Sequence, residues 1–443
     1  MSNQCDIING DTRRNLCIMT LPMFAAMLLN IAYNYVDSLW IGNLLGETAY
    51  AALTNATPVV LVLTSIAMGA TNGVSILLSQ AIGSKDQERI DGLITTSLVN
   101  AILFSLLVTV VLECFLPQLL IALGSPVETY EMACAYLRIY LIGYLFDFLF
   151  LYFSAVLRSF GNAVFQMLAM LISTILNAFL DPFFIRQFGF NGAAIATLLA
   201  QGLCMVFMIV YLLLKRPFAV RCRAYHFPLL TEIFDKAFPS IIQQCIPAIS
   251  TAFLTALISG YGVSAIAAYG ISSKLETILF YPAMALNMVL TTIVGQCIGS
   301  KRLDRANDYL RCALKGGGMV LLLLTILMVT YAKNLSWLFV QSTPVMNIVG
   351  LYFAIVSIGY ILNTFTNSFL GMLNGLGKPS NSMLLMVFYY IMVRMPLAAW
   401  LSSDGFGLYG IWIAILLSHI CAAAAAWLVT RLQIKHNGHL LLK

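Results

Sequence analysis

The sequence predicts an all-α polytopic membrane protein with twelve transmembrane helices in two parallel six-helix bundles. Three observations lead to this prediction. Of the 443 residues, 60% are hydrophobic and only 9% are charged, whereas about a quarter of the residues in a soluble domain are charged. Apolar runs of about 20 residues, enough for a helix to cross a bilayer, recur along the whole chain. Motifs of the first half also reappear in the second half.

Polar breaks between the apolar runs give the expected limits of the helices. These are 15–43, 49–82, 88–115, 126–157, 162–186, 191–214, 233–259, 264–297, 307–333, 343–373, 380–403 and 407–434. Several of these runs exceed the thickness of a bilayer, so we expect those helices to tilt, kink or project beyond it.

Basic residues predict the orientation of the chain in the membrane. They gather in segments that fall on one side: Arg13, Arg14, Lys85, Arg89, Arg158, Lys215, Arg216, Arg221, Arg223, Lys301, Arg302, Arg305, Lys378, Arg431 and Lys435. The opposite loops hold little beyond Arg186 and Lys333. Since cytoplasmic loops are rich in Lys and Arg, we expect both termini to be cytoplasmic. The net charge of +6 then reflects topology, and no nucleic-acid partner is expected.

An internal repeat predicts the domain organisation. "LSQAIGSKDQERID" (78–91) reappears as "VGQCIGSKRLDRAND" (294–308), and "LRSFGNAVFQM" (157–167) is echoed by "LNGLGKPSNSM" (373–383). Pro22 corresponds to Pro239 in the same way. Six helices per repeat make the two repeats parallel. We therefore expect an N-terminal bundle (1–214), a cytoplasmic linker (215–232) and a C-terminal bundle (233–443).

Acidic residues within the predicted helices point to a functional site in the first bundle. Asp37, Asp147 and Asp181 lie in apolar runs, where each carboxylate costs about 2.5–3.5 kcal/mol. Residues 37, 181 and 197 are expected at one depth, roughly 8–9 Å below the outer surface. Asn177, four residues before Asp181, shares its helix face, and the proline at 182 would free backbone carbonyls one turn back.

These side chains predict an all-oxygen cluster of Asp37, Asn177, Asp181 and Thr197. Two ionised carboxylates there repel each other, which favours uptake of a proton, and the same oxygens suit Na⁺. The coupling ion is thus H⁺ or Na⁺, without a cofactor. Scattered cysteines and histidines indicate neither a metal site nor disulfides.

Structural roles remain open for these residues. Asn177 and Thr197 can also serve as interhelical hydrogen bonders, and Asp181 can pair with Arg394. Asp147 either lines a central cavity that attracts cations or pairs with Lys274 or Arg394. Glu276 is close enough to Lys274 along the chain to be neutralised locally.

Aromatic and methionine side chains suggest the substrate class. They are Tyr144, Phe148 and Tyr152 on the fourth helix, and Phe280, Tyr281, Met284 and Met288 on the eighth. Surfaces of this kind adapt to varied apolar cations, although ordinary packing would use the same residues.

The motifs "YVDSLWIG" in the first helix, "GVSILLSQAIGSKD" after the second and "LNAFLDPFFI" in the fifth resemble those of the multidrug and toxic compound extrusion (MATE) family. The resemblance spans the whole chain, and within the family it points to the DinF-like branch or related bacterial multidrug transporters. The NorM-like branch has carboxylates in helices 7 and 10 that this chain lacks.

The resemblance implies the MATE/MOP-flippase-like fold and drug efflux driven by H⁺ or Na⁺. It assigns the coupling site to Asp37, Asn177, Asp181 and Thr197, with Tyr136 or Tyr140 as a coupling tyrosine and Pro22 as the hinge of helix 1. It further implies a monomer in the bacterial inner (cytoplasmic) membrane.

The function expected is therefore secondary active antiport of amphipathic or cationic organic compounds by alternating access. The alternative is a flippase for lipid-linked saccharides from the same superfamily, although such proteins often have fourteen helices and a cationic cavity. The sequence lacks DDxxD-type motifs and a protease-like Ser/His or Asp dyad, so we do not expect an enzyme.

Overall fold

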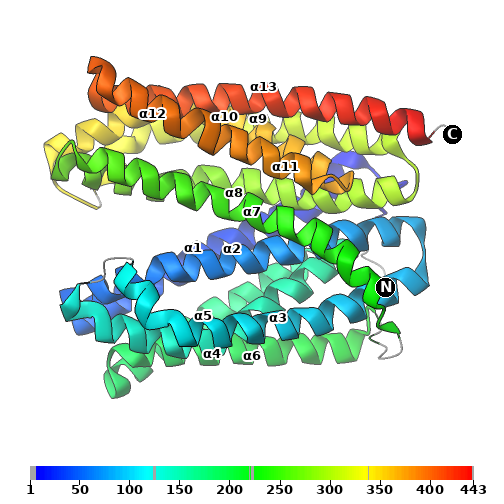
Figure 1. Cartoon of the computed structure of the whole chain (residues 1–443), viewed down its shortest axis with the longest axis horizontal. Coiled ribbons are helices and arrows are strands. Elements are labelled where there is room, and N and C mark those ends of the chain that lie inside the picture. Colours follow the sequence, from blue (N-terminus) through cyan, green and yellow to red (C-terminus); the bar gives the residue numbers. More distant parts are fainter. Residues whose placement is uncertain (1–5, 123–125, 219, 221–223, 338, 442–443) are drawn as a thin grey trace.

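The computed structural model describes residues 6–122, 126–218, 220, 224–337 and 339–441. The first half of the chain forms one lobe of six helices, and the second half forms the other (Figure 1). The first lobe contains α1 (Thr12–Leu45), α2 (Glu47–Ser84), α3 (Gln87–Ala122), α4 (Val127–Ser159), α5 (Val164–Phe188) and α6 (Phe190–Lys215).

The second lobe begins with α7 (Phe227–Ser259), α8 (Val263–Gly299), α9 (Leu303–Trp337) and α10 (Thr343–Gly375). Its eleventh crossing is built from α11 (Pro379–Met386), a π-helical segment η2 (Val387–Arg394), α12 (Met395–Leu401) and a second π-helical segment η3 (Ser402–Phe406). The last crossing is α13 (Gly407–Leu441).

The prediction of twelve crossings is confirmed. The described residues hold eleven helical runs long and apolar enough to span a membrane, and the last of these, Pro379–His436, is 58 residues long. The backbone leaves helical geometry at Asp404 and Gly405, so this run turns back and crosses twice.

The linker is shorter than the sequence predicted. The predicted linker covered 215–232, but α6 ends at Lys215 and α7 already begins at Phe227. Pro228 occupies the first turn of α7, where a proline fits because the N–H that it lacks has no helical partner at that position. Residues 219 and 221–223 of the predicted linker lie outside the described residues.

Backbone geometry repeats between the two lobes. Lys85 after α2 and Lys301 after α8 both adopt the left-handed conformation, with φ of 58° and 60°. Non-glycine residues seldom adopt this conformation. Gly161 and Gly377, which follow α4 and α10, likewise share positive φ values of 85° and 76°. The sequence repeat therefore corresponds to a repeated course of the chain.

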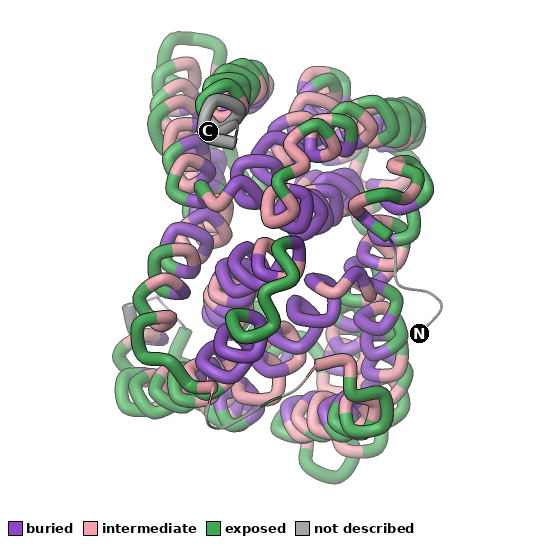
Figure 2. The backbone as a smooth tube through the Cα atoms, turned by 90° about the vertical axis from the view of Figure 1, so that its right-hand side faces the viewer, coloured by how far each residue is buried: buried purple, intermediate pink, exposed green. Residues whose placement is uncertain are grey.

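We call the end of the bundle that carries the start of α1, the α6–α7 connection and the end of α13 the inner end (right in Figure 1). Figure 2 looks onto this end and shows buried residues concentrated where the two lobes meet. The central contact is between α2 and α7, where Gly69 and Gly73 face Ile241 and Ala237 so closely that neither glycine has room for a side chain. Small residues one turn apart are what allow membrane helices to pack this closely.

Hydrogen bonds between the lobes lie in the inner half of the molecule, as far as the described residues show. Gln80 Nε2 donates to Gly375 O at 2.9 Å, and Gln296 Nε2 donates to Ser159 O at 2.6 Å. At the surface, Arg89 and Glu232 form an ion pair at 2.7 Å. The structure is therefore closed at its inner end.

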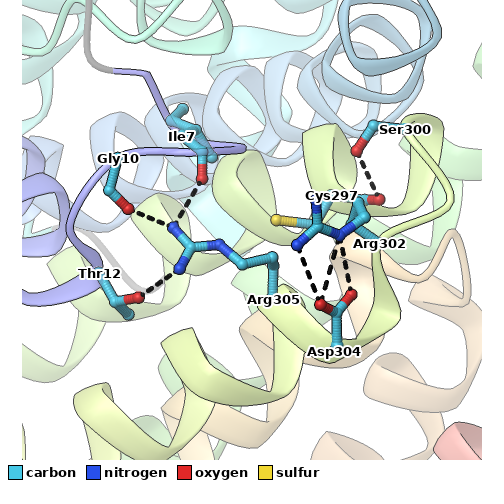
Figure 3. Close-up of polar contacts among 8 residues, drawn as sticks. All are labelled: Ile7, Gly10, Thr12, Cys297, Ser300, Arg302, Asp304 and Arg305. Atoms are coloured by element: carbon cyan, nitrogen blue, oxygen red, sulfur yellow. Dashed lines mark hydrogen bonds and ion pairs between the residues drawn. The ribbon is translucent and has the colours of Figure 1, made fainter.

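The segment before α1 is fastened to α9 of the opposite lobe. The Arg305 guanidinium donates to Gly10 O, to Ile7 O at 3.4 Å and to Thr12 Oγ1 at 3.0 Å (Figure 3). Tyr309 OH also donates to Ile7 O at 2.9 Å. These hydrogen bonds form a further connection between the two lobes at the inner end.

Arg305→Gln is expected to weaken the attachment of the segment before α1 to α9, because hydrogen bonds from a charged donor contribute about 1.5–3 kcal/mol. Backbone amides of residues 6–11 should then exchange with deuterium at least roughly tenfold faster, since about 1.4 kcal/mol corresponds to a factor of ten. Hydrogen-exchange mass spectrometry measures this change.

Arg302→Gln provides the matched control. Arg302 lies on the same surface but pairs with the exposed Asp304 at 3.1 Å (Figure 3), and this hydrogen bond lowers the pKa of the Asp304 carboxyl. Equal exchange rates at residues 6–11 in Arg305→Gln, Arg302→Gln and the unsubstituted protein would show that Arg305 does not hold the segment.

Candidate functional site

Two buried aspartates from different helices lie close together in the first lobe. Asp37 on α1 is 7% exposed, and Asp181 on α5 is fully buried. Their carboxylates are near enough to interact electrostatically. Since α1 ends at Leu45 and α5 at Phe188, both aspartates lie about 11–12 Å below the outer helix ends.

Three neighbouring side chains add oxygen atoms to the aspartate pair. Asn177 lies one turn before Asp181 on α5, and its Nδ2 donates to Asp181 Oδ1 at 2.8 Å. Thr197 on α6 is 4% exposed. Tyr33 lies one turn before Asp37 on the same face of α1, and its hydroxyl interacts electrostatically with both aspartates. We call these five residues the acidic cluster.

The acidic cluster contains unpaired polar atoms. Asp37 Oδ1, Asp181 Oδ2 and Asn177 Oδ1 are buried and have no hydrogen-bond partner among the described residues, whereas the Tyr33 hydroxyl is within hydrogen-bonding reach of Thr197. Buried polar atoms are almost always paired, so three unpaired oxygens in one place indicate room for a ligand. Hard cations prefer oxygen ligands, and a carboxylate can also take up a proton.

A cavity of about 250 Å³ adjoins the acidic cluster. It is lined by α1, α2, α4, α5 and α6 of the first lobe and by α8 of the second. Tyr33, Asp37 and Thr197 are in its wall, whereas Asn177 and Asp181 are not among its lining residues. We call this the central cavity. Its lining residues Asn30 and Asn34, in the outer half of α1, are exposed, so the cavity is accessible from that half.

One face of α4 supplies polar side chains to the central cavity. Tyr136, Tyr140, Asp147, Leu151 and Arg158 all line it. They follow one another at intervals of four and seven residues, which places them along a single helix face. Both tyrosines that the family resemblance suggested for coupling are therefore in the cavity wall, together with the predicted cavity residue Asp147.

The predicted substrate residues of α8 divide between two surroundings. Tyr281, Met284 and Met288 line the central cavity and bring the second lobe into its wall. Phe280 points elsewhere and packs edge-to-face on Tyr360, with ring centroids 5.7 Å apart.

The three aromatic residues predicted on α4 lie outside the central cavity. Tyr144 OH donates to Leu63 O of α2 at 3.1 Å, and Tyr152 OH donates to Ile94 O of α3 at 2.8 Å. Phe148 packs on Phe104 of α3. All three lie on the face of α4 that packs on α2 and α3, and Phe148 and Tyr152 line a separate cavity of about 320 Å³ between α2, α3, α4 and α7.

Pro22 lies within α1, which continues through it as a helix. Its missing N–H leaves a carbonyl one turn back without a helical partner. Residue 37 is 15 residues further along, about 22 Å. A bend at Pro22 would displace Asp37, and the hinge role remains a prediction.

Sequence reasoning missed Tyr33, Arg158 and Gln166 as cavity residues. Arg158 was assigned to a cytoplasmic loop, but it belongs to the last turn of α4 and is 3% exposed. Gln166, near the start of α5, also lines the cavity and is 9% exposed. The spacing of Tyr33 to Asp37 is a signal that was available.

The second lobe holds a separate polar cluster, which corrects the suggested partners of Arg394 and Glu276. Arg394 donates to Ser418 Oγ at 3.0 Å and to Tyr389 OH at 2.6 Å, so it pairs with neither Asp181 nor Asp147. Glu276 accepts hydrogen bonds from two tyrosines of α10, Tyr352 and Tyr360.

Lys274 instead lies over the ring of Phe339, 5.9 Å from its centre. The sequence placed Lys274 and Glu276 together because they are neighbours in the chain, but residues two apart on a helix do not face each other.

Comparisons of the sequence and of the fold with known proteins lead to the same group of proteins. The family model described as MatE matches residues 22–183 and again residues 239–400. The chain is 26% identical over 440 residues to the probable multidrug resistance protein YpnP of Bacillus subtilis, covering 94% of this chain and 95% of that protein. It is 25% identical over 437 residues to the FAD transporter of Shewanella oneidensis, covering 96% of each.

A solved structure described as the outward-facing conformation of a multidrug resistance MATE family transporter of the MOP superfamily has the same fold. The TM-score is 0.93 at 24% identity, and the alignment covers 98% of this chain and 99% of that one.

Proposed function

Because the chain belongs to the MATE family, we propose that it is a secondary active exporter that moves amphipathic organic cations outward in exchange for H⁺ or Na⁺. It would reside in a bacterial inner membrane with both termini cytoplasmic. Its similarity to proteins named as multidrug resistance or multidrug export proteins supports the general activity. The coupling ion and the exchange mechanism are inferred from the acidic cluster.

The observation that carries this proposal is the set of unpaired oxygens beside the central cavity. An ion bound among Asp37 Oδ1, Asp181 Oδ2 and Asn177 Oδ1 would satisfy atoms that are otherwise buried without partners. It would also neutralise a carboxylate in the cavity wall. The affinity of the cavity for a cationic substrate would then fall.

Coupling requires that ion and substrate favour different states of the protein. The inner end is closed by bonds between the lobes, and the cavity is reached from the outer half. Ion uptake at Asp37 in this state, with α1 bending near Pro22, would promote substrate release outward. Substrate would reload after the lobes part at the inner end.

The lining of the central cavity favours export of cations over the flippase alternative. Among the described lining residues, Asp37 and Asp147 are acidic and Arg158 is the one basic residue. A cavity built for a lipid pyrophosphate would need several cations. The wall also contains methionines of both lobes, including Met27 and Met284, and methionine adapts to ligands of different shape.

Ethidium efflux from membrane vesicles tests the proposal directly. We expect an inward gradient of H⁺ or of Na⁺, imposed separately, to accelerate ethidium efflux from vesicles that contain the protein. The matching ionophore should abolish the acceleration, and vesicles without the protein provide the background. Efflux that responds to neither gradient would exclude ion-coupled export.

A further inference from the structure

The inner end of the central cavity holds a buried positive charge that the proposed ion coupling does not use. Arg158 lines this cavity and is 3% exposed, and its Nε has no hydrogen-bond partner among the described residues. The ion pairs formed by described residues do not include it. A buried charge without a partner is costly, so its retention calls for an anionic ligand.

A second unpaired side chain lies at the same end of the cavity. Gln166 lines the cavity from the first turns of α5, and its Oε1 is buried without a partner among the described residues. Only a short loop separates α5 from the end of α4 that carries Arg158. The unpaired Gln166 Oε1 is an acceptor, so the donors available to an anion at this end are the N–H groups of the guanidinium and of the carboxamide nitrogen.

We propose that Arg158, assisted by Gln166, binds the anionic group of a zwitterionic amphipathic substrate whose cationic group lies toward Asp147 and Asp37. The anionic group is a carboxylate or a phosphate, both of which accept paired N–H bonds from arginine. The inference rests on the proposed export function and defines its substrate class more closely.

The charges along α4 set the polarity of the site. Asp147 and Arg158 line the same cavity on one face of α4, and eleven residues separate their Cα atoms by about 16 Å. The arginine stays ionised in proteins, whereas the acidic cluster exchanges ions. Ion uptake therefore weakens the hold on the cationic group and leaves the anionic group bound to Arg158.

The contact between the lobes fixes the end of α4 that carries Arg158. The next residue, Ser159, accepts a hydrogen bond on its carbonyl from Gln296 of α8 at 2.6 Å, and its hydroxyl lies 2.9 Å from Ser75 Oγ. Parting of the lobes at the inner end breaks the bond to Gln296 and frees the end of α4. In the state that is closed at the inner end, these contacts therefore position Arg158 at the end of the central cavity.

Binding of norfloxacin and its methyl ester to the purified full-length protein tests the proposal. The free acid carries a carboxylate and a protonated amine, while the ester lacks the carboxylate. We expect the unsubstituted protein to prefer the acid by roughly tenfold or more, as charged hydrogen bonds contribute that much. Arg158→Gln should reduce this preference to near one, and Arg158→Lys should retain part of it.

Arg138→Gln is the matched control. Arg138 is also on α4, but it is exposed, lies outside the cavity and pairs with Glu113 at 3.8 Å. Its substitution should keep the preference for the acid. Size-exclusion profiles check that each variant is folded, and the comparison of the two ligands on the unsubstituted protein needs no variant.

The outcomes separate this inference from the proposed function. Equal affinity of the unsubstituted protein for acid and ester, or an unchanged preference in Arg158→Gln, overturns the anion site and leaves the exporter standing. Failure to bind norfloxacin, its ester or ethidium overturns both. Loss of the preference for the acid when phosphatidylglycerol is added would assign Arg158 to a lipid phosphate, against the proposal.

Discussion

Asp37→Asn is expected to abolish ion-driven export. The amide keeps the shape of the side chain, but it neither takes up a proton nor offers a charged ligand to Na⁺. Asp37 is the carboxylate that both belongs to the acidic cluster and faces the central cavity. Drug resistance of a sensitised bacterium should fall to the level of cells without the protein, and gradient-driven ethidium efflux should fall to background.

The control for this substitution is Asp404→Asn, since Asp404 is exposed in the turn between the last two crossings. It should leave resistance intact. We expect Asp37 and Asp181 to act as one unit in coupling, so the double variant should be no worse than Asp37→Asn alone. Full resistance in Asp37→Asn at normal expression would remove this residue from coupling.

The fold was largely predictable because the membrane imposes simple rules. Each crossing needs a long apolar helix, so polar breaks mark the ends of helices in the sequence. The left-handed residues Lys85 and Lys301 lie in a motif that the sequence itself repeats. The start of α7 was placed too late because Pro228 was taken as part of a loop, whereas its position in the chain also suits a first helical turn.

The two aspartates of the acidic cluster were accessible from the sequence because carboxylates are rare in apolar helices. Asp37 and Asp181 stand out by type alone, and counting from the helix ends gives their common depth. The apolar wall of the cavity was harder to predict. Tyr136 and Tyr140 face the cavity while Tyr144 and Phe148 face away, since which face of a helix lines a cavity depends on neighbours that the sequence does not specify.

Arg158 likewise shows that the sequence does not specify the surroundings of a side chain, in this case a charged one. Its charge at the end of a predicted helix is what the rule for cytoplasmic loops expects. Only the packing of α4 against α5 and α8 shows that the side chain turns inward and is buried. Charge type therefore predicted a side of the membrane for this residue, but it could not reveal the surroundings of the side chain.

Gly73→Leu is expected to prevent closure of the inner end. A Cβ atom on Gly73 would lie 2.4 Å from the Cα of Ala237 on α7, a distance that only movement of α2 away from α7 can relieve. Overpacking of this kind costs about 1–3 kcal/mol or more. We expect a clear drop in the melting temperature of the purified protein and loss of ethidium efflux.

Gly202→Leu on α6 separates this effect from a general cost of leucine in place of glycine. Open space surrounds the position where the Cβ of residue 202 would be, so this variant should melt and transport as the unsubstituted protein does. Alternating access needs the lobes to approach each other in one state and to part in the other, and the glycines of α2 make the approach possible. Normal efflux by Gly73→Leu would show that transport proceeds without this contact, and the closed inner end would then be incidental to the cycle.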